Sequence, residues 1–307
     1  MLPLSEAAVA EAARLILEGE PVAVPTETVY GLAADATNAE AVARIYAAKG
    51  RPSFNPLIVH VPDLAAAERL AVFSEAARAV AAAFWPGPVT LVLPLSEQAG
   101  LAPAVTARLG TIALRCPAHP AMRALLEACG RPLAAPSANA SGRISPVSAA
   151  HVLASLGGRV RLILDGGASE QGLESTIVRI DAAGVSLLRL GPVDLADIAA
   201  VAGLAEAAAG PGIEAPGQLA SHYAPTKPVR LNAREAAAGE WLIGFGAVAG
   251  DESLSPSGDL REAAANLFSA LHRAEAKAPE RIAVAPIPEE GIGRAINDRL
   301  RRAAAPR

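Results

Sequence analysis

Short runs of branched apolar residues alternate with helical stretches along the first two-thirds of the chain. The runs at 56–61 and 88–95 predict buried strands, and the stretch 74–84 between them predicts a helix. Farther along, 175–181 and 185–191 predict two strands with no helix between them. Strands joined both through helices and directly to each other predict an α/β sheet of mixed direction.

The other elements of this region show the usual start and stop signals. The first predicted helix, for example, has an N-cap in Ser5 and a stop in Gly19. Further helices are expected at 38–50, at 118–130 and in a segment that ends near 203. Further strands are expected at the start of 21–36, which then becomes a polar loop, at 110–117, at the start of 131–146 and at 160–167.

A Gly-, Ala- and Pro-rich segment at 204–228 interrupts this pattern and predicts a linker between domains. We therefore expect a first domain at 1–203 and a small C-terminal α/β domain at 229–307. The small domain should be Rossmann-like with three layers, but it has no GxGxxG after its first strand, so we assign it no nucleotide. Its expected strands are 229–232, 241–246 and 281–288, and its expected helices are 259–277 and 291–305.

Composition excludes several classes of protein. The chain is 52% hydrophobic and 19% charged, so it can bury cores and is not disordered. Its net charge of −4 argues against a general nucleic-acid binder, which needs a basic surface. Cys116 and Cys129 lack CxxC spacing and suggest neither a disulfide framework nor a zinc site. With no leader and no apolar run of about 20 residues, we expect a cytoplasmic protein without membrane contact.

Polar residues gather at the ends of the predicted strands, where α/β sheets usually place sites. Lys49, Arg51 and Asn55 precede the strand 56–61, which contains His60. One cation is explained by the helix dipole, but two cations and an amide suit a phosphate chain better. His60 is either a satisfied core residue or a hydrogen-bonding partner of a small polar substrate. The loop that contains Thr26, Glu27, Thr28 and Tyr30 is read as an ordinary polar loop when taken alone.

Two more clusters carry hydrogen-bonding groups. Thr111 and Arg115 share strand parity, and Arg115 needs either a protein partner such as Asp35 or Glu27, or a substrate carboxylate. The loop "APSANASGRISP" interleaves small hydroxyl and amide side chains with Ala and Gly, without a P-loop or GxSxG pattern. Such a cation- and hydroxyl-rich set binds phosphates and a small zwitterion, and it catalyses by positioning and charge stabilisation. The further members of this set are Ser137, Asn139, Ser141, Ser145, Ser175 and Arg189.

Five motifs in order carry a specific resemblance: "PTETVYGL", "KGRPSFNPLIVHV", "FWPGPVTLVL", "PSANASGRISP" and "ESTIVRI". Over roughly residues 5–203 the chain resembles the YrdC-type domain of threonylcarbamoyl-AMP synthases, which implies a twisted mixed sheet. The "APGQLASHYAP" linker and the C-terminal domain resemble the two-domain branch of that family. The linker departs from the family where a methionine and a basic residue are expected before His222 and Tyr223.

The resemblance implies that L-threonine, bicarbonate and ATP give threonylcarbamoyl-AMP and diphosphate, the first step of the modification of adenosine 37 in tRNA. It implies Mg²⁺ carried by the ATP phosphates with no metal ligand from the protein, and a downstream tRNA threonylcarbamoyl-transferase complex that receives the product. Direct tRNA binding is not required, and no residue stands out as a general base. His222 and Tyr223 would close over the pocket.

The resemblance also implies a role for individual residues. The implied catalytic set is Lys49, Arg51, Ser137 and Asn139. The residues implied to face ATP are Arg51, Asn55, Thr111, Ser137, Ser145, Arg189 and Tyr223. The residues implied to face threonine are Thr28, His60, Arg115, Ala135 and Ser175, with Arg115 taking the carboxylate.

Three alternatives remain open at this point. Carbamoyl transfer, as in hydrogenase-maturation proteins with the same domain type, would require CxxC zinc elements and an acylphosphatase-like region, and this sequence has neither. A non-catalytic RNA-binding or ribosome-associated module is disfavoured by the acidic net charge. A degenerate regulatory homologue is disfavoured because the catalytic set of four residues is intact.

Overall fold

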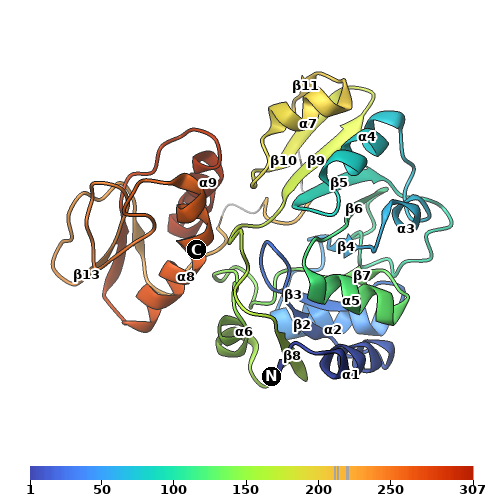
Figure 1. Cartoon of the computed structure of the whole chain (residues 1–307), viewed down its shortest axis with the longest axis horizontal. Helices are drawn as coiled ribbons and strands as arrows, with labels where there is room; N and C mark the ends of the chain where they lie inside the picture. Colours follow the sequence, from blue (N-terminus) through green and yellow to red (C-terminus); the bar gives the residue numbers. More distant parts are fainter. Residues whose placement is uncertain (211, 213, 219–220, 307) are drawn as a thin grey trace.

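The computed structural model describes residues 1–210, 212, 214–218 and 221–306. The predicted linker at 204–228 therefore lies partly outside the described residues. The larger unit contains an eleven-stranded sheet (Figure 1). Its strands are β1 (Leu2–Pro3), β2 (Val22–Val24), β3 (Gly31–Asp35), β4 (Ile58–His60), β5 (Val89–Pro94), β6 (Thr111–Arg115), β7 (Leu133–Ala134), β8 (Leu162–Asp165), β9 (Thr176–Asp181), β10 (Gly184–Arg189) and β11 (Glu206–Ala207).

The sheet has the mixed direction that the sequence predicts. The strand order is β1-β8-β2-β3-β7-β4-β6-β5-β9-β10-β11. Neighbours such as β4 and β6 or β5 and β9 run parallel, whereas β2 and β3, β5 and β6, and β9 and β10 run antiparallel. Between β4 and β6 the register places His60 opposite Arg115, so two predicted site residues end neighbouring strands at the same edge.

Helices cover both faces of this sheet because each buries one apolar stripe. The helices are α1 (Glu6–Leu17), α2 (Ala39–Lys49), α3 (Leu64–Glu68), α4 (Glu75–Phe84), α5 (Pro120–Cys129), α6 (Ala149–Leu156) and α7 (Leu195–Ala202). Helices α1 and α5 form one core cluster with β2 and β8. Helices α2, α4, α6 and α7 share the main core cluster with the central strands. The result is a three-layer unit with the sheet in the middle.

The C-terminal unit is built on a four-stranded parallel sheet in the order β12-β15-β13-β14. Its elements are β12 (Val229–Arg230), β13 (Glu240–Gly244), β14 (Glu252–Ser253), α8 (Leu260–Ala276), β15 (Arg281–Val284) and α9 (Gly293–Ala304). Alternation along β13 decides the layers: Ile243 joins the core of α8 and α9, whereas Leu242 joins a small cluster with Ala233 and Ala283. Both helices therefore cover one face, which differs from the three layers predicted from the sequence.

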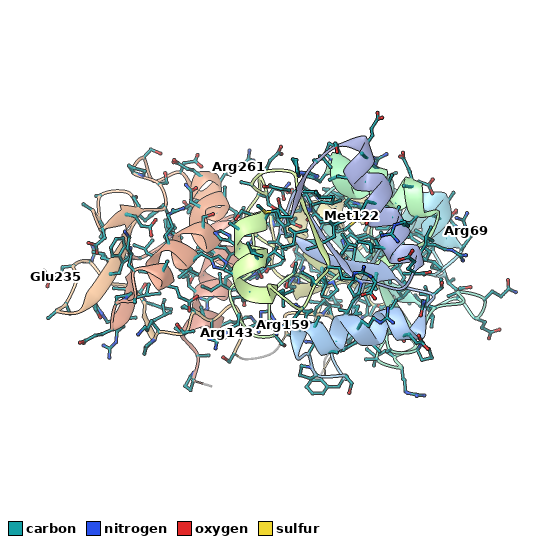
Figure 2. All side chains as sticks on the ribbon, turned by 90° about the horizontal axis from the view of Figure 1, so that it is seen from below. Arg69, Met122, Arg143, Arg159, Glu235 and Arg261 are labelled. Carbon is teal, nitrogen blue, oxygen red and sulfur yellow. The ribbon has the colours of Figure 1, made fainter. Side chains whose placement is uncertain are left out.

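The two helices of this unit lie between its sheet and the larger unit (Figure 1). Their core cluster includes side chains from both units, among them Val29, Ile144 and Leu173 of the larger unit. Figure 2 shows Glu235 and Arg69 at opposite ends of the molecule, with this shared core between them. Among the described residues, no helix is both long and apolar enough to cross a membrane. The domain boundaries at 203 and 228 stay a prediction.

Candidate functional site

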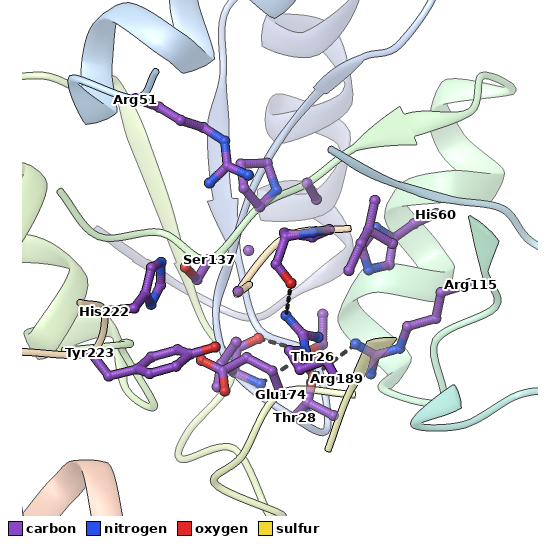
Figure 3. Close-up of a pocket in the computed structure, with 17 residues that line it drawn as sticks. Thr26, Thr28, Arg51, His60, Arg115, Ser137, Glu174, Arg189, His222 and Tyr223 are labelled. Atoms are coloured by element: carbon purple, nitrogen blue, oxygen red, sulfur yellow. Dashed lines mark hydrogen bonds between the residues drawn. The ribbon is translucent and has the colours of Figure 1, made fainter. Parts of the chain in front are cut away.

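A pocket opens where β4, β6, β7 and β10 end, beside the loop that follows β2 and the segment that leads to the C-terminal unit (Figure 3). The remaining cavity volume is about 50 Å³, far below the roughly 300–1,000 Å³ of typical ligand pockets. Residues of the linking segment, among them His222 and Tyr223, contribute to the lining of this cavity. Eight predicted site residues line it: Thr28, Arg51, His60, Arg115, Ala135, Ser137, Arg189 and Tyr223.

Arg115 is buried and holds three protein partners at the pocket wall. Its Nη2 donates to Oε1 of Glu27 at 2.6 Å, and its Nη1 donates to Oγ1 of Thr28 at 2.8 Å. Its Nε donates to the carbonyl oxygen of Gly87 at 3.1 Å. Burial alone would raise the pKa of the Glu27 carboxyl, but the charge and hydrogen bond of Arg115 outweigh burial and lower it. The sequence left Asp35, Glu27 or a substrate carboxylate open as partners, and the structure shows Glu27 as one of them.

Arg51 and Arg189 supply two further cations to the lining. Arg51 follows Gly50, whose left-handed φ of 59° ends α2 and turns the chain toward the pocket. Its Nη2 donates to the carbonyl oxygen of Pro56 at 2.8 Å, and burial lowers its pKa to about 10. Arg189 donates from Nε and Nη2 to the carbonyl oxygen of Ser175, at 3.1 and 3.0 Å. Burial also lowers the pKa of Arg189.

Lys49 lies behind the pocket wall instead of facing the cavity. Its Nζ donates to the carbonyl oxygens of Ser137 and Asn139, each at 2.5 Å. Burial and the nearby charge of Arg51 lower the pKa of Lys49 well below its usual value. The Nζ group of Lys49 thus holds the "PSAN" loop in place, and Ser137 of that loop lines the cavity.

Three uncharged polar side chains complete the lining. Burial lowers the pKa of both His60 and His222 to about 3, so both imidazoles are neutral near pH 7. Nδ1 of His60, Nδ1 of His222 and Oη of Tyr223 are buried and have no hydrogen-bond partner among the described residues. Buried polar atoms are normally satisfied, so these three fit a bound polar ligand.

The other predicted residues do not line the pocket. Ser175 Oγ lies 2.7 Å from Thr90 Oγ1, and Ser145 Oγ donates to Glu174 Oε1 at 2.5 Å. Asn139 donates its amide to two loop carbonyls, which closes the loop on itself. The residues outside the lining are Lys49, Asn55, Thr111, Asn139, Ser145 and Ser175. Of these, Asn55 is notable because both polar atoms of its side chain are buried without a partner among the described residues.

Sequence reasoning missed two residues that shape the pocket. Glu174 lines the cavity and is buried, yet it precedes β9 in a segment from which we singled out only Ser175. Gly217 lines the cavity with a φ of 88°, and an added Cβ there would lie 2.8 Å from both Arg189 Cδ and Tyr223 Oη. A signal for Gly217 existed in the Pro-Gly dipeptide ahead of "HYAP", which marks a turn.

The charges of the lining favour an anionic ligand. Arg51, Arg115 and Arg189 face a cavity whose described lining holds one carboxylate, Glu174. Among the described residues, no group of three or more His, Cys, Asp or Glu side chains is arranged to hold a metal ion. The site can therefore bind a polyanion through arginines, hydroxyls and backbone groups.

Comparisons with known proteins identify the family of the chain. Two family models match the chain, "Telomere recombination" over residues 14–191 and "Threonylcarbamoyl-AMP synthase, C-terminal domain" over residues 193–305. The Bacillus subtilis protein named threonylcarbamoyl-AMP synthase is 39% identical, over 100% of this chain and 95% of its own length. The Pyrococcus abyssi protein of the same name is 40% identical, over 95% of this chain and 93% of its own.

A solved structure matches the whole fold. The crystal structure of P. abyssi Sua5 complexed with L-threonine superposes with a TM-score of 0.90 at 36% identity, covering 99% of this chain and 98% of that one. The match includes both units, so the sequence-predicted YrdC-like sheet with a smaller α/β unit is confirmed. The chain belongs to the two-domain threonylcarbamoyl-AMP synthase family.

Proposed function

We propose that the chain catalyses the reaction of L-threonine, bicarbonate and ATP to threonylcarbamoyl-AMP, diphosphate and water, the first step of threonylcarbamoyl modification of adenosine 37 in tRNA. The observation that carries this proposal is the enclosed pocket with three arginines and one carboxylate in its described lining. Full-length relatives that bear the enzyme's name, and a close structural neighbour solved with L-threonine, support the choice of substrates.

We assign the threonine subsite to the wall formed by Thr28, His60, Ala135 and Arg115, with Ser175 behind Arg189. Arg115 has five N–H donors, and three protein contacts leave part of its fork for the substrate carboxylate. The neutral imidazole of His60 can accept or donate a hydrogen bond to the substrate without adding charge.

The ATP subsite is assigned to a second group of residues. Arg51, Ser137, Arg189 and Tyr223 line it. The remaining residues assigned to it are Asn55, Thr111 and Ser145. His222 and Tyr223 of the linking segment close this part of the lining. Lys49 and Asn139 support this group through the loop that carries Ser137.

The chemical step follows from these positions. The threonine amine adds to CO₂ from bicarbonate and loses a proton, which gives a carbamate. A carbamate oxygen attacks the α-phosphorus of ATP in line, the bond to the bridging oxygen breaks, and diphosphate leaves. Arg51 and Arg189 offset the charge that develops on the phosphates. Mg²⁺ enters with ATP as part of the substrate.

The product and the compartment complete the proposal. Threonylcarbamoyl-AMP is a mixed anhydride, so a downstream tRNA threonylcarbamoyl-transferase complex receives it without this chain having to bind tRNA directly. We place the protein in the cytoplasm, where the free and buried Cys116 and Cys129 remain reduced.

The direct test is diphosphate release from ATP and Mg²⁺, with threonine and bicarbonate each omitted in turn. We expect release that requires both, with L-serine in place of L-threonine as the control for selectivity. Release without threonine would point to carbamoyl transfer or simple hydrolysis instead. No release, together with RNA affinity that falls steeply with salt, would favour the RNA-binding alternative.

A further inference from the structure

Arg299 of α9 is buried at the boundary between the two units, although it belongs to the smaller one. Its side chain is 0% exposed, and it is among the largest fully buried side chains of the molecule. A buried guanidinium is costly unless charges and hydrogen bonds satisfy it. The hydrogen-bond and charge partners of Arg299 therefore indicate its role.

The partners of Arg299 tie α9 to the pocket. Its Nε donates to Glu174 Oε2 at 2.8 Å, and its Nη2 donates to the carbonyl oxygen of Leu190 at 2.7 Å. Its Nη1 donates to Asp298 on the same helix at 2.8 Å. Glu174 lines the pocket, and its other oxygen accepts from Ser145, which is assigned to ATP.

The same guanidinium also supports an aromatic wall of the pocket. Its central carbon lies 5.0 Å from the ring centroid of Tyr223, within the range of a cation–π contact. Tyr223 has a left-handed φ of 61°, which a residue with a bulky side chain adopts only when its surroundings hold it. Phe268 of α8 packs against the ring at 5.7 Å, and the amide of His222 donates to the carbonyl oxygen of Arg302 at 3.2 Å.

We propose that Arg299 is a positioning residue of the ATP subsite, which it completes from the C-terminal unit by holding Glu174 and Tyr223 in place. This inference rests on the proposed function, in which ATP lies against Tyr223. The charge balance supports it: burial would raise the pKa of Glu174, but Arg299 and then Arg189 outweigh burial and keep the carboxylate ionised. The C-terminal unit therefore contributes to nucleotide affinity without touching the nucleotide.

We expect the loss of Arg299 to change the affinity for ATP more than the rate of the chemical step. Without Arg299, Glu174 is a buried charge that lacks its main partner, and Tyr223 loses the group that fixes its ring. The binding-competent arrangement then becomes a smaller fraction of the population, which raises the apparent Kd by the inverse of that fraction. We expect the KM for ATP to rise about tenfold or more, with kcat changed by less than about threefold.

The experiment compares Arg299→Met and Arg299→Lys with a matched control on the same helix, Arg301→Met. Arg301 is exposed and pairs with Glu289 at 2.6 Å, away from the pocket. Steady-state kinetics with ATP varied gives the split between KM and kcat. Hydrogen exchange at the amides of His222 and Ala224, which donate to the carbonyl oxygens of Arg302 and Gly142, measures the positioning directly, without activity. Lysine keeps the charge for Glu174 but not the planar fork, so Arg299→Lys should fall between wild type and Arg299→Met.

A raised KM for ATP together with faster exchange at these amides in Arg299→Met, and neither in Arg301→Met, supports the proposal. An unchanged KM in a folded Arg299→Met protein overturns it, as does a fall in kcat with unchanged exchange. If Arg299→Met does not fold, the double variant Glu174→Gln, Arg299→Met removes both charges and is judged by the same KM and exchange criteria. If the wild type makes no threonylcarbamoyl-AMP, the proposed function fails, but the exchange comparison still decides the positioning role.

Discussion

Lys49 shows that a predicted site residue can support the pocket without facing its cavity. The resemblance implies that Lys49 and Arg51 are equivalent members of one catalytic set. In the structure, Lys49 gives its hydrogen bonds to two loop carbonyls, whereas Arg51 lines the cavity. The two residues differ because the 137–139 loop lies against Lys49 in the folded protein. The spacing of residues along the sequence does not show where that loop lies.

This difference predicts that Lys49→Met is a stability variant as well as an activity variant. The substitution leaves the carbonyls of Ser137 and Asn139 without their donor, and each buried unsatisfied group costs about 1–3 kcal/mol. Urea denaturation should therefore show a free energy of unfolding lower by roughly 2 kcal/mol. Lys227→Met, outside the pocket, is the control. Unaltered stability of Lys49→Met would show that the loop does not depend on the Nζ group of Lys49.

Arg115 illustrates a second limit of residue-level reasoning. The sequence offered a protein carboxylate or a substrate carboxylate as its anion, as if one excluded the other. The structure pairs Arg115 with Glu27 and also places it in the pocket lining. Asp35, the other candidate partner, instead accepts from the amide and hydroxyl of Thr37. Which carboxylate pairs with Arg115 depends on the fold, because Arg115 and Glu27 are 88 residues apart in the sequence.

At the scale of elements, regular patterns were predictable and weak ones were not. Amphipathic helices with caps, such as α2 and α8, fall within one residue of the predicted ranges. Strand β3 lies in a stretch that the sequence marks as polar loop, because "GLAAD" has no branched residue other than leucine. Its extended conformation comes from hydrogen-bonded pairing with β2 and β7 and not from strand propensity. Helix α6, only eight residues long, and β11, two residues within the predicted linker, were also missed.

The pocket was predictable where its residues lie in local motifs and not where they depend on distant partners. Thr28, Arg51, His60 and Ser137 stand at strand ends or in loops that the sequence marks as polar. Glu174 draws its role from Arg299, which is 125 residues away in another unit. No local periodicity connects two such positions.

The linking segment yields a prediction that separates backbone strain from pocket shape. Gly217 and Gly212 both have left-handed φ values, 88° and 127°, so alanine is strained at either position. Only at Gly217 would the new carbon meet Arg189 and Tyr223, whereas nothing described lies within 4 Å of it at Gly212. Gly217→Ala should weaken ATP binding about tenfold or more, by crowding two residues of the subsite. Calorimetric titration with ATP measures this.

Gly212→Ala is the matched control, since it carries the strain without the crowding. We expect its affinity for ATP to stay close to wild type and its melting temperature to fall slightly. Equal losses of affinity in both variants would assign the effect to the backbone of the segment, and the crowding argument would then be wrong.

At the scale of the whole molecule, burial affects every histidine in the same direction. The pKa values of the five histidines are all lowered, first of all by burial. Two of them, His151 of α6 and His272 of α8, stack across the boundary between the units with ring centroids 3.9 Å apart. Burial lowers both pKa values to about 4, and for His151 the charges of His272 and Arg273 lower it further.

The sign of the resulting pH dependence follows from linkage. Between pH 6.5 and about 4, histidines of the unfolded chain bind protons that these buried rings do not, so the unfolded state gains stability as the pH falls. The stability is fully present above pH 6.5 and is lost progressively below it. Measurements between pH 7 and 5 avoid most of the titration of Glu27 and Glu174, whose pKa values lie below the usual 4.5.

We therefore predict that the urea midpoint of unfolding falls from pH 7 to pH 5, and that His151→Phe makes this fall shallower. Phenylalanine keeps a ring against His272 but binds no proton, so it removes the contribution of His151 to the slope. The slope of the midpoint against pH, and not the absolute stability of the variant, is the measured outcome. A midpoint that does not change between pH 7 and 5 would show that the buried histidines do not make the stability depend on pH. Parallel slopes for wild type and His151→Phe would show that His151 does not contribute to that dependence.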